Sequence, residues 1–165
     1  MRFVVQEHRA RSLHYDFRLE AGGVLKSWAV PKGPATDPRE KRLAVRTPDH
    51  PLDYASFEGV IPAGEEGAGP VIVWDAGTYR NRTEQHGKKI SVEKAVERGH
   101  VVFELHGKKL RGGYALTRAG HWSGDDWLLV KMVDTYADPA RDPVRDEPES
   151  VLSGRTLEQV ARRGR

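Results

Sequence analysis

The sequence has no cysteine among its 165 residues, which excludes disulfide bonds and thiolate metal sites. Any metal ion would therefore be held by histidine and carboxylate side chains. Long apolar runs are also absent, since stretches such as 71–74 and 127–130 fall far short of the roughly 20 residues that a membrane-spanning helix needs. Residues 1–8 lack the apolar region of a secretory signal peptide. We therefore expect a soluble, cytoplasmic protein with no membrane partner.

The net charge is only +3, but the charges are unevenly distributed. Residues 1–46 carry ten Lys or Arg against five Asp or Glu, whereas residues 47–76 carry six acidic side chains and no basic one. Bases again outnumber acids, eleven to seven, in residues 77–136. A basic surface interrupted by one acidic segment is compatible with a nucleic-acid partner. An ordinary solvated surface explains the same charges equally well.

Short segments rich in β-branched and aromatic residues dominate the chain, and Gly or Pro pairs separate most of them. They predict strands at 3–7, 13–20, 24–30, 43–46, 71–74, 101–105, 114–117 and 127–132. Residues 21–23 (Ala-Gly-Gly) fit a hairpin turn, and one mid-chain helix is indicated between a capping Ser91 and a terminating Gly99. These signals predict a mainly β fold, either a compact, mostly antiparallel barrel or a sandwich. Of the two, we favour a closed or partly open antiparallel β-barrel with one or two flanking helices.

The composition changes at Ala137. Residues 138–150 contain three prolines and many charged side chains, with little to bury. We therefore assign residues 1–136 to the β-barrel domain and residues 137–165 to a linker or surface wrap. Residues 153–156 offer a cap for a short basic helix over 157–163.

The most informative segment is 13–19, which alternates Leu, His, Tyr, Asp, Phe, Arg and Leu. In a strand, alternate side chains point to opposite faces, so His14, Asp16 and Arg18 share one face and the apolar residues share the other. His8 lies an even number of residues upstream and joins the polar face if the strand is continuous. Imidazole and carboxylate groups bind metals, and the forked guanidinium group of arginine binds phosphate through two parallel hydrogen bonds. A polar, solvent-facing strand is the alternative explanation. The remaining histidines, His86, His100, His106 and His121, fit surface or structural roles.

Two further groups of residues are candidates for anion chemistry. His50 and Tyr54 lie in a proline-containing segment that we interpret as a rigid loop, where an imidazole can act as an acid, a base or a donor to phosphate. By spacing alone, a turn capped by Asp49 with a packed tyrosine ring is the more common arrangement. Lys32, in a tight Pro-Lys-Gly-Pro loop, and Arg42 could bind an anion, although a loop lysine is more often simply solvated.

Taken in order, the motifs resemble the 3′-phosphoesterase domain of bacterial ATP-dependent ligase D, which also exists as a free-standing protein. The motifs are FVVQEH (3–8), LHYDFRLE (13–20), KSWAVPKGP (26–34), KRLAV (41–45), DHPLDY (49–54), FEGVIP (57–62), VWDAGTY (73–79) and WLLVK (127–131). The resemblance covers nearly the whole chain to about residue 134.

The resemblance implies a Mn²⁺-preferring enzyme that heals DNA 3′ ends in non-homologous end joining, with Co²⁺, Zn²⁺ or another divalent ion as alternatives. Such enzymes remove a terminal 3′-ribonucleoside and then hydrolyse the remaining 3′-phosphate to a 3′-hydroxyl. The substrate would be a DNA or DNA–RNA primer-template end, and a DNA ligase and an end-binding protein would be partners.

By position in the motifs, residues of this chain match three roles. The metal ligands are His8, His14 and Asp16; the phosphate-binding groups are Arg18, Lys32, Arg42 and His50; the catalytic groups are His50, Tyr54 and Arg18.

The sequence departs from the family pattern at two places, and each departure predicts an effect on function. The chain begins five residues before Gln6, without the N-terminal arm of many fused members, so we expect phosphate removal to be better retained than ribonucleoside removal. Glu66 stands where the family usually has an aromatic residue, which should alter the rim of the groove rather than the chemistry.

Two other functions fit part of the pattern. A non-haem Fe(II) oxygenase also uses two histidines and one carboxylate on a β-barrel, but three separate cations favour phosphate over a single organic acid. A non-catalytic module that binds nucleic-acid ends would use the same polar face only to follow the backbone.

Overall fold

The computed structural model describes residues 1–120 and 124–163, so His121 lies outside the described residues. In chain order the elements are β1 (Arg2–Arg9), β2 (Leu13–Ala21), β3 (Val24–Val30), β4 (Arg42–Pro51), the 3₁₀ helix η1 (Leu52–Ser56), β5 (Gly59–Ile61), β6 (Gly69–Asn81), β7 (Glu84–Gln85), β8 (Lys88–Lys89), α1 (Val92–Arg98), β9 (His100–Gly107), β10 (Arg111–Arg118), β11 (Asp126–Lys131), α2 (Pro143–Asp146) and α3 (Leu157–Arg163).

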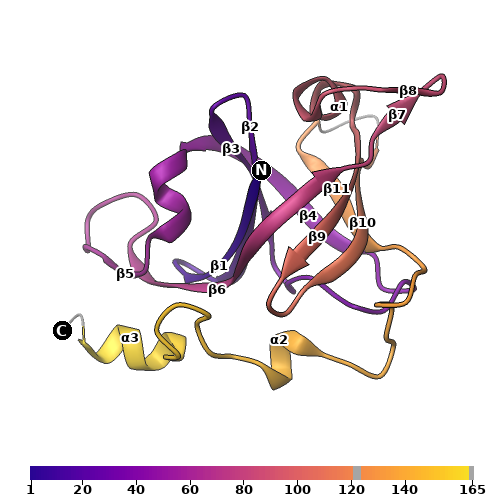
Figure 1. Cartoon of the computed structure of the whole chain (residues 1–165). Coiled ribbons are helices and arrows are strands. Elements are labelled where there is room, and N and C mark those ends of the chain that lie inside the picture. The colour runs from indigo at the N-terminus through magenta and orange to yellow at the C-terminus, as the bar shows by residue number, and fades with distance from the viewer. Residues whose placement is uncertain (121–123, 164–165) are drawn as a thin grey trace.

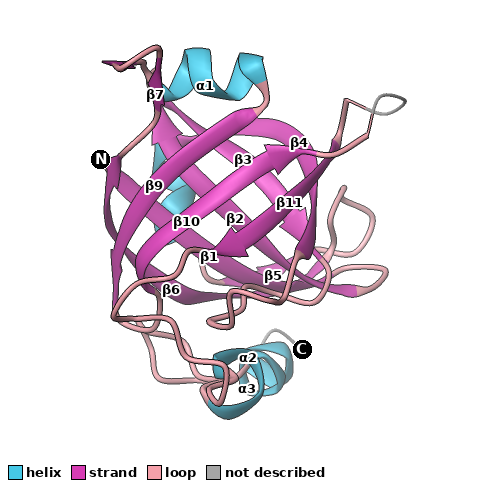
Figure 2. Cartoon of the chain, turned by 90° about the vertical axis from the view of Figure 1, so that its right-hand side faces the viewer, coloured by secondary structure: helices cyan, strands magenta, loops and turns pink. Residues whose placement is uncertain are grey.

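Eight of these strands form a closed antiparallel barrel, which confirms the predicted fold class (Figure 2). Neighbours follow the order β1-β2-β3-β4-β11-β10-β9-β6, and a pairing between β1 and β6 closes the ring. The short strand β5 pairs with the first residues of β6, from Gly69 to Val71. Three short α-helices accompany the barrel in the described chain, one more than the sequence indicated.

Aromatic side chains fill the barrel interior. Trp28 and Trp127 meet edge to face with ring centroids 5.4 Å apart, and Phe17 lies 5.6 Å from Phe103. All four are at most 1 % exposed. The apolar face of the alternating segment 13–19 therefore supplies the core, and its polar face is directed to the outside of the barrel.

Local signals account for the elements at the upper end of the barrel. The hairpin between β2 and β3 turns at Gly22 and Gly23, whose φ angles of 62° and 79° are both in the left-handed region that this two-residue turn needs. Helix α1 starts where the Ser91 hydroxyl accepts a hydrogen bond from the Lys94 amide, and it ends at Gly99 with φ 84°. Both predictions are confirmed.

Strand β4 corrects one prediction. The sequence suggested a strand over 43–46 followed by a rigid loop, but β4 continues to Pro51 and pairs with β3 as far as Val24. The pairing of β4 with β11 extends only as far as Val45. Beyond that point β4 has one neighbouring strand, so an edge position tolerates the missing amide hydrogen of Pro48. His50 is consequently held in a strand.

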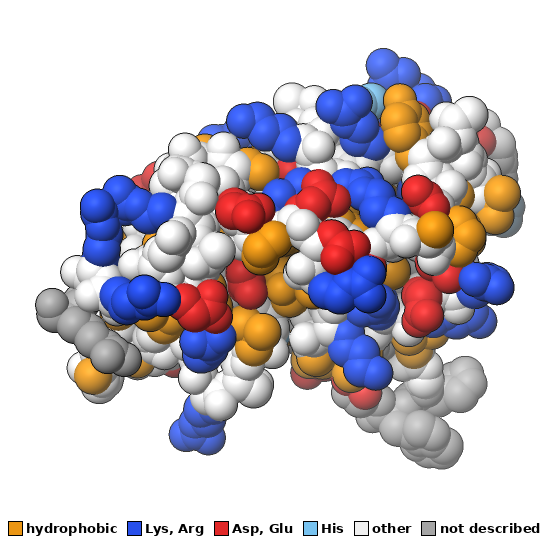
Figure 3. All heavy atoms as spheres, turned by 90° about the horizontal axis from the view of Figure 1, so that it is seen from below, with side chains coloured by type: hydrophobic (Ala, Val, Ile, Leu, Met, Phe, Trp, Pro, Cys, Tyr) orange, Lys and Arg blue, Asp and Glu red, His pale blue; other side chains and the backbone are white. Residues whose placement is uncertain are grey.

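The tail, defined here as residues 137–163, runs along the lower end of the barrel and ends beside β5 and β6 (Figure 1). Seen from below, this face carries acidic and basic side chains interspersed with apolar ones (Figure 3). Val144 packs against the main core, and the Trp74 indole Nε1 donates to the Glu147 carbonyl at 2.8 Å. None of the helices in the described part of the chain has the length and apolar character needed to cross a membrane.

Candidate active site

The β1–β2 hairpin brings His8, His14 and Asp16 together on the outer face of the barrel. Its register places His8 directly opposite His14 and Gln6 opposite Asp16, and directly opposed residues project to the same face. One ligand atom from each of the three residues lies within 4.8 Å of the others. The even spacing seen in the sequence therefore corresponds to one compact cluster.

The two imidazoles converge on a single oxygen of Asp16. His8 Nδ1 lies 3.5 Å and His14 Nε2 lies 3.3 Å from Asp16 Oδ2. The opposite ring nitrogens meet carbonyl oxygens, with His8 Nε2 2.6 Å from Gly67 O and His14 Nδ1 3.1 Å from Ser12 O. A carbonyl only accepts, so each outer nitrogen acts as a donor. In the neutral form of each ring, the inner nitrogen presents a lone pair beside the carboxylate, which gives the donor set of a divalent metal ion.

The protonation of this cluster follows from its contacts. The hydrogen bond to Asp16 raises the pKa of His14 above its ordinary value, and this outweighs burial, which lowers it. For Asp16, burial raises the pKa, but hydrogen bonds from His14 and His8 and the charge of Arg18 lower it well below its usual range. The carboxylate is therefore ionised, and a proton on His14 competes with a metal ion for the same position.

Arg18 is a buried cation directly beside the cluster. It is 3 % exposed, and its Nη2 lies 3.4 Å from Asp16 Oδ2. Its Nε donates to Gln6 Oε1 at 2.7 Å and its Nη1 donates to Ser27 Oγ at 2.8 Å. Burial lowers the pKa of Arg18 and the charge of Asp16 raises it, yet a guanidinium starts so high that it stays charged. The fork is fixed in place before any substrate arrives.

His50 and Tyr54 approach the same guanidinium from β4 and η1. His50 Nδ1 lies 3.1 Å from Arg18 Nη1 and 3.1 Å from Pro48 O, and the Arg18 guanidinium lies 5.1 Å from the centre of the Tyr54 ring. Burial, followed by the charge of Arg18, lowers the pKa of His50, which favours a neutral ring. Nδ1 donates to Pro48 O in one tautomer and accepts from Arg18 in the other, and in the second tautomer the hydrogen on Nε2 is available as a donor. Burial also raises the pKa of Tyr54, so its phenol keeps its proton.

Lys32 and Arg42 make a separate set of contacts within the described residues. Arg42 Nη1 donates to Lys32 O at 2.8 Å and to Gly33 O at 3.3 Å, and the Lys32 side chain is exposed. Arg42 is two residues from Ala44, which faces the core, so strand alternation directs it away from the outer face. Among the described hydrogen bonds and ion pairs, neither side chain contacts the three candidate metal ligands.

Gln6 and Gly67 are site residues that the sequence reasoning missed. Gln6 is fully buried, and its Nε2 donates to Tyr54 O at 2.9 Å and to Phe57 O at 3.1 Å while its Oε1 holds Arg18. It lies two residues before His8, so the same alternation could have identified it. Gly67 acts through its backbone carbonyl, for which a residue type gives no signal.

An open pocket of about 600 Å³ lies beside His14. Its lining comes from the β1–β2 turn and from the loop before β6: Ala10, Arg11, Ser12, His14, Glu65, Glu66, Gly67 and Ala68. Glu66 is therefore at the rim of the space next to the candidate metal ligands. The site thus combines a three-ligand metal set, a buried arginine fork and an adjacent opening.

Fold and site together define a β-barrel protein with a candidate metal centre of two histidines and one carboxylate, next to an anion-binding guanidinium. Residues 6–118 match the family described as the DNA ligase D 3′-phosphoesterase domain. The chain belongs to this family.

Similar curated proteins are all much longer than this chain. It is 49% identical over 160 residues to the multifunctional non-homologous end joining protein LigD of Pseudomonas aeruginosa, which is 95% of this chain and 18% of that protein. It is 52% identical over 130 residues to the multifunctional non-homologous end joining DNA repair protein LigD of Mycobacterium tuberculosis, covering 79% of this chain and 16% of that protein. The chain thus spans less than a fifth of either relative.

Proposed function

We propose that the protein is a divalent-metal-dependent 3′-phosphoesterase that acts on DNA ends during repair by end joining. Its finer activities would be hydrolysis of a 3′-phosphate to a 3′-hydroxyl and removal of a 3′-terminal ribonucleoside. The observation that carries the proposal is the convergence of His8 Nδ1 and His14 Nε2 on Asp16 Oδ2, 3.4 Å from Arg18 Nη2. A metal position next to a fixed guanidinium matches a phosphate group, which needs both.

The three ligands fit Mn²⁺ and other divalent ions of similar preference, because imidazole nitrogens and a carboxylate oxygen suit that group of metals. When bound, such an ion supplies Lewis-acid polarisation of a phosphoryl oxygen and a more acidic water. The carbonyls of Gly67 and Ser12 keep both imidazoles in the tautomers that this role requires.

In the proposed mechanism, the side chains around the metal position bind and orient the phosphoester. Arg18 neutralises charge on the oxygens of the transferring phosphoryl group, the electrostatic contribution that dominates this chemistry. His50 presents Nε2–H to the leaving oxygen or to a phosphate oxygen, and Tyr54 orients the group through its phenol. Lys32 and Arg42 bind outer phosphate oxygens in this proposal, and Arg42 also supports the Lys32 loop through the two carbonyls that it contacts.

The experiment uses end-labelled primer-templates with either a 3′-phosphate or a 3′-ribonucleotide, incubated with each divalent ion and resolved on a denaturing gel. We expect 3′-hydroxyl products with Mn²⁺. Replacing His14 with alanine should lower phosphate release by about 10²- to 10³-fold. His106→Ala is the matched control, because the His106 side chain is exposed and, among the described hydrogen bonds and ion pairs, contacts only Glu104 at 3.2 Å.

Near-normal phosphate release by the His14→Ala protein would remove His14 from the site. Binding to ends with no product and no metal dependence would favour the non-catalytic module instead. Oxygen consumption with Fe²⁺ and a 2-oxo acid would favour the oxygenase. The ligase and end-binding partners, like the cytoplasmic location, belong to this proposal.

A further inference from the structure

Glu58 connects the tail to the segment that covers the candidate site. We define the covering segment as residues 52–68, which runs from η1 across the outer face of β1. Glu58 Oε1 accepts hydrogen bonds from Ser150 Oγ at 2.5 Å and from the Val73 amide at 2.9 Å, and its Oε2 accepts from Ser153 Oγ. One carboxylate thus joins the covering segment, β6 and the tail.

The tail is also packed against both strands that flank Glu58. The Val151 amide donates to Val73 O at 2.9 Å, which adds the tail to β6 as a short pairing. Leu157 and Val160 of α3 form a small apolar cluster with Ile72, and Val60 of β5 packs against it. This part of the tail is therefore packed and hydrogen-bonded against β5 and β6.

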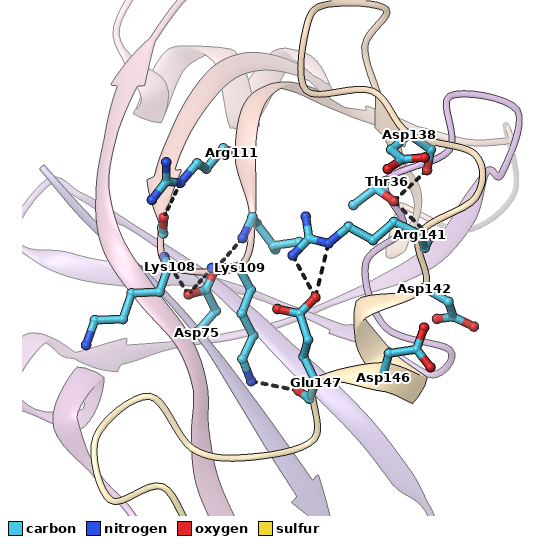
Figure 4. Close-up of polar contacts among 12 residues, drawn as sticks. Thr36, Asp75, Lys108, Lys109, Arg111, Asp138, Arg141, Asp142, Asp146 and Glu147 are labelled. Carbon is cyan, nitrogen blue, oxygen red and sulfur yellow. Dashed lines mark hydrogen bonds and ion pairs between the residues drawn. The ribbon is translucent and has the colours of Figure 1, made fainter.

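The other end of the tail is anchored at the base of the barrel (Figure 4). Arg141 donates through Nε and Nη2 to Glu147 Oε2 at 3.0 and 2.8 Å, and Lys109 Nζ donates to Glu147 O at 2.8 Å. The Thr36 hydroxyl contacts the carbonyls of Asp138 and Arg141 at 2.8 and 3.0 Å. The tail is thus held along its length, and the Thr36 contacts lie at the end of it that is remote in sequence from Ser150 and Ser153.

The covering segment contacts the candidate site at both of its ends. Phe57, which precedes Glu58, accepts from Gln6 Nε2, and Gln6 in turn holds the Arg18 fork. Gly67 accepts from His8 Nε2 and so fixes the tautomer of that ring. The tail therefore reaches Gln6, which orients Arg18, through the Glu58 carboxylate and the carbonyl of the preceding residue, Phe57.

We propose that Glu58 is a positioning residue for the phosphoesterase site, through which the tail keeps the covering segment in register with Gln6 and Arg18. The inference deepens the proposed function and rests on it wherever activity is measured. The residues that match the family, 6–118, include Glu58 but not the tail serines, so the family match assigns no role to this connection.

The test compares Glu58→Ala with Glu58→Gln in the full chain. Partners that orient a functional group contribute about 10- to 100-fold, so Glu58→Ala should lower kcat on a 3′-phosphate primer by that factor, with a smaller change in KM. Glu58→Gln keeps the Oε1 acceptor and offers an amide to Ser153, whose hydroxyl can also accept. It should restore activity to within about threefold of the original protein.

Thr36→Val is the matched control, since it removes buried hydrogen bonds of the tail at the other anchor and leaves the covering segment untouched. It should lower the melting temperature with kcat nearly unchanged. A readout independent of catalysis is the NMR resonance of the Arg18 Nε–H, which the bond to Gln6 protects from exchange with water. Glu58→Ala should broaden or shift this resonance, and Thr36→Val should not.

Three results would overturn the inference: Glu58→Ala with unchanged kcat and an unchanged Arg18 resonance, Thr36→Val with an equal loss of kcat, or no restoration by Glu58→Gln. If the original protein releases no phosphate, the proposed function fails, and the Arg18 resonance still decides the positioning role.

If Glu58→Ala does not fold, Ser153→Ala replaces it. That variant removes one exposed hydroxyl and should lose about three- to tenfold in kcat, so unchanged kcat there is also a refutation.

Discussion

Replacing Arg18 with lysine tests whether the fork geometry, rather than the positive charge, makes the site work. The guanidinium donates to Gln6 and Ser27, contacts His50 and lies beside Asp16. A lysine keeps the charge but presents a single ammonium, which cannot reach these groups together.

The structure sets the size of the expected effect. Loss of one pre-organised donor to a developing charge typically lowers kcat by about 10²- to 10³-fold, and we expect Arg18→Lys to fall in this range. Each buried acceptor left without its donor costs about 1–3 kcal/mol of folding stability. Because Gln6 Oε1 and Ser27 Oγ both lose a donor, we expect a destabilisation of about 2–6 kcal/mol if neither is reached by lysine or water.

The assay combines initial rates on a 3′-phosphate primer with thermal unfolding. Arg46→Lys is the control, because Arg46 is a half-buried arginine of β4 that contacts Ser27 O, Thr47 O and Asp49 and lies over the Trp28 ring. It should lose stability but retain activity. An Arg18→Lys protein within about threefold of the original rate would refute the reasoning, as would an equal rate loss in Arg46→Lys.

Three further predictions follow from protonation and burial. His50→Gln, which keeps a donor near the Nε2 position, should retain more phosphate release than His50→Ala; equal loss in both would instead make proton transfer by the imidazole essential. Mn²⁺ binding, measured by titration calorimetry, should weaken as pH falls through the raised pKa of His14, because metal and proton compete; a pH-independent affinity would contradict this. Burial lowers the pKa of Lys109 to about 8 from 10.5, so protonation is less favourable in the folded state. Its contribution to stability should therefore rise between about pH 8 and pH 10.5, and denaturant unfolding should show a flatter pH dependence there for Lys109→Met.

The sequence predicted the parts of the site that depend on local periodicity. His8, His14, Asp16 and Arg18 were found because a strand has a period of two and because the two strands of one short hairpin share a register. Gln6 obeys the same rule and was overlooked because an amide is not a metal ligand.

Other features depend on contacts between distant segments and have no local signature. Gly67 acts through a carbonyl, and the Glu58 contacts with Ser150 and Ser153 join residues more than 90 positions apart. The continuation of β4 to Pro51 was not predicted because proline usually interrupts a strand. Here proline is tolerated because, beyond Val45, β4 pairs with β3 but no longer with β11. Whether residues 1–136 form a domain separate from 137–165 stays a prediction.

The three candidate ligands all come from one hairpin, the nine consecutive residues from His8 to Asp16, and Arg18 follows two residues later on the same strand. The register of this hairpin therefore fixes the distances between the ligands, and changes in loops elsewhere on the barrel do not alter them. The rim around Glu65 and Glu66 belongs to a different segment and can change without disturbing that hairpin. Under the proposed function, substitutions in this rim change substrate preference, among related proteins or under directed evolution, while the metal ligands stay in place.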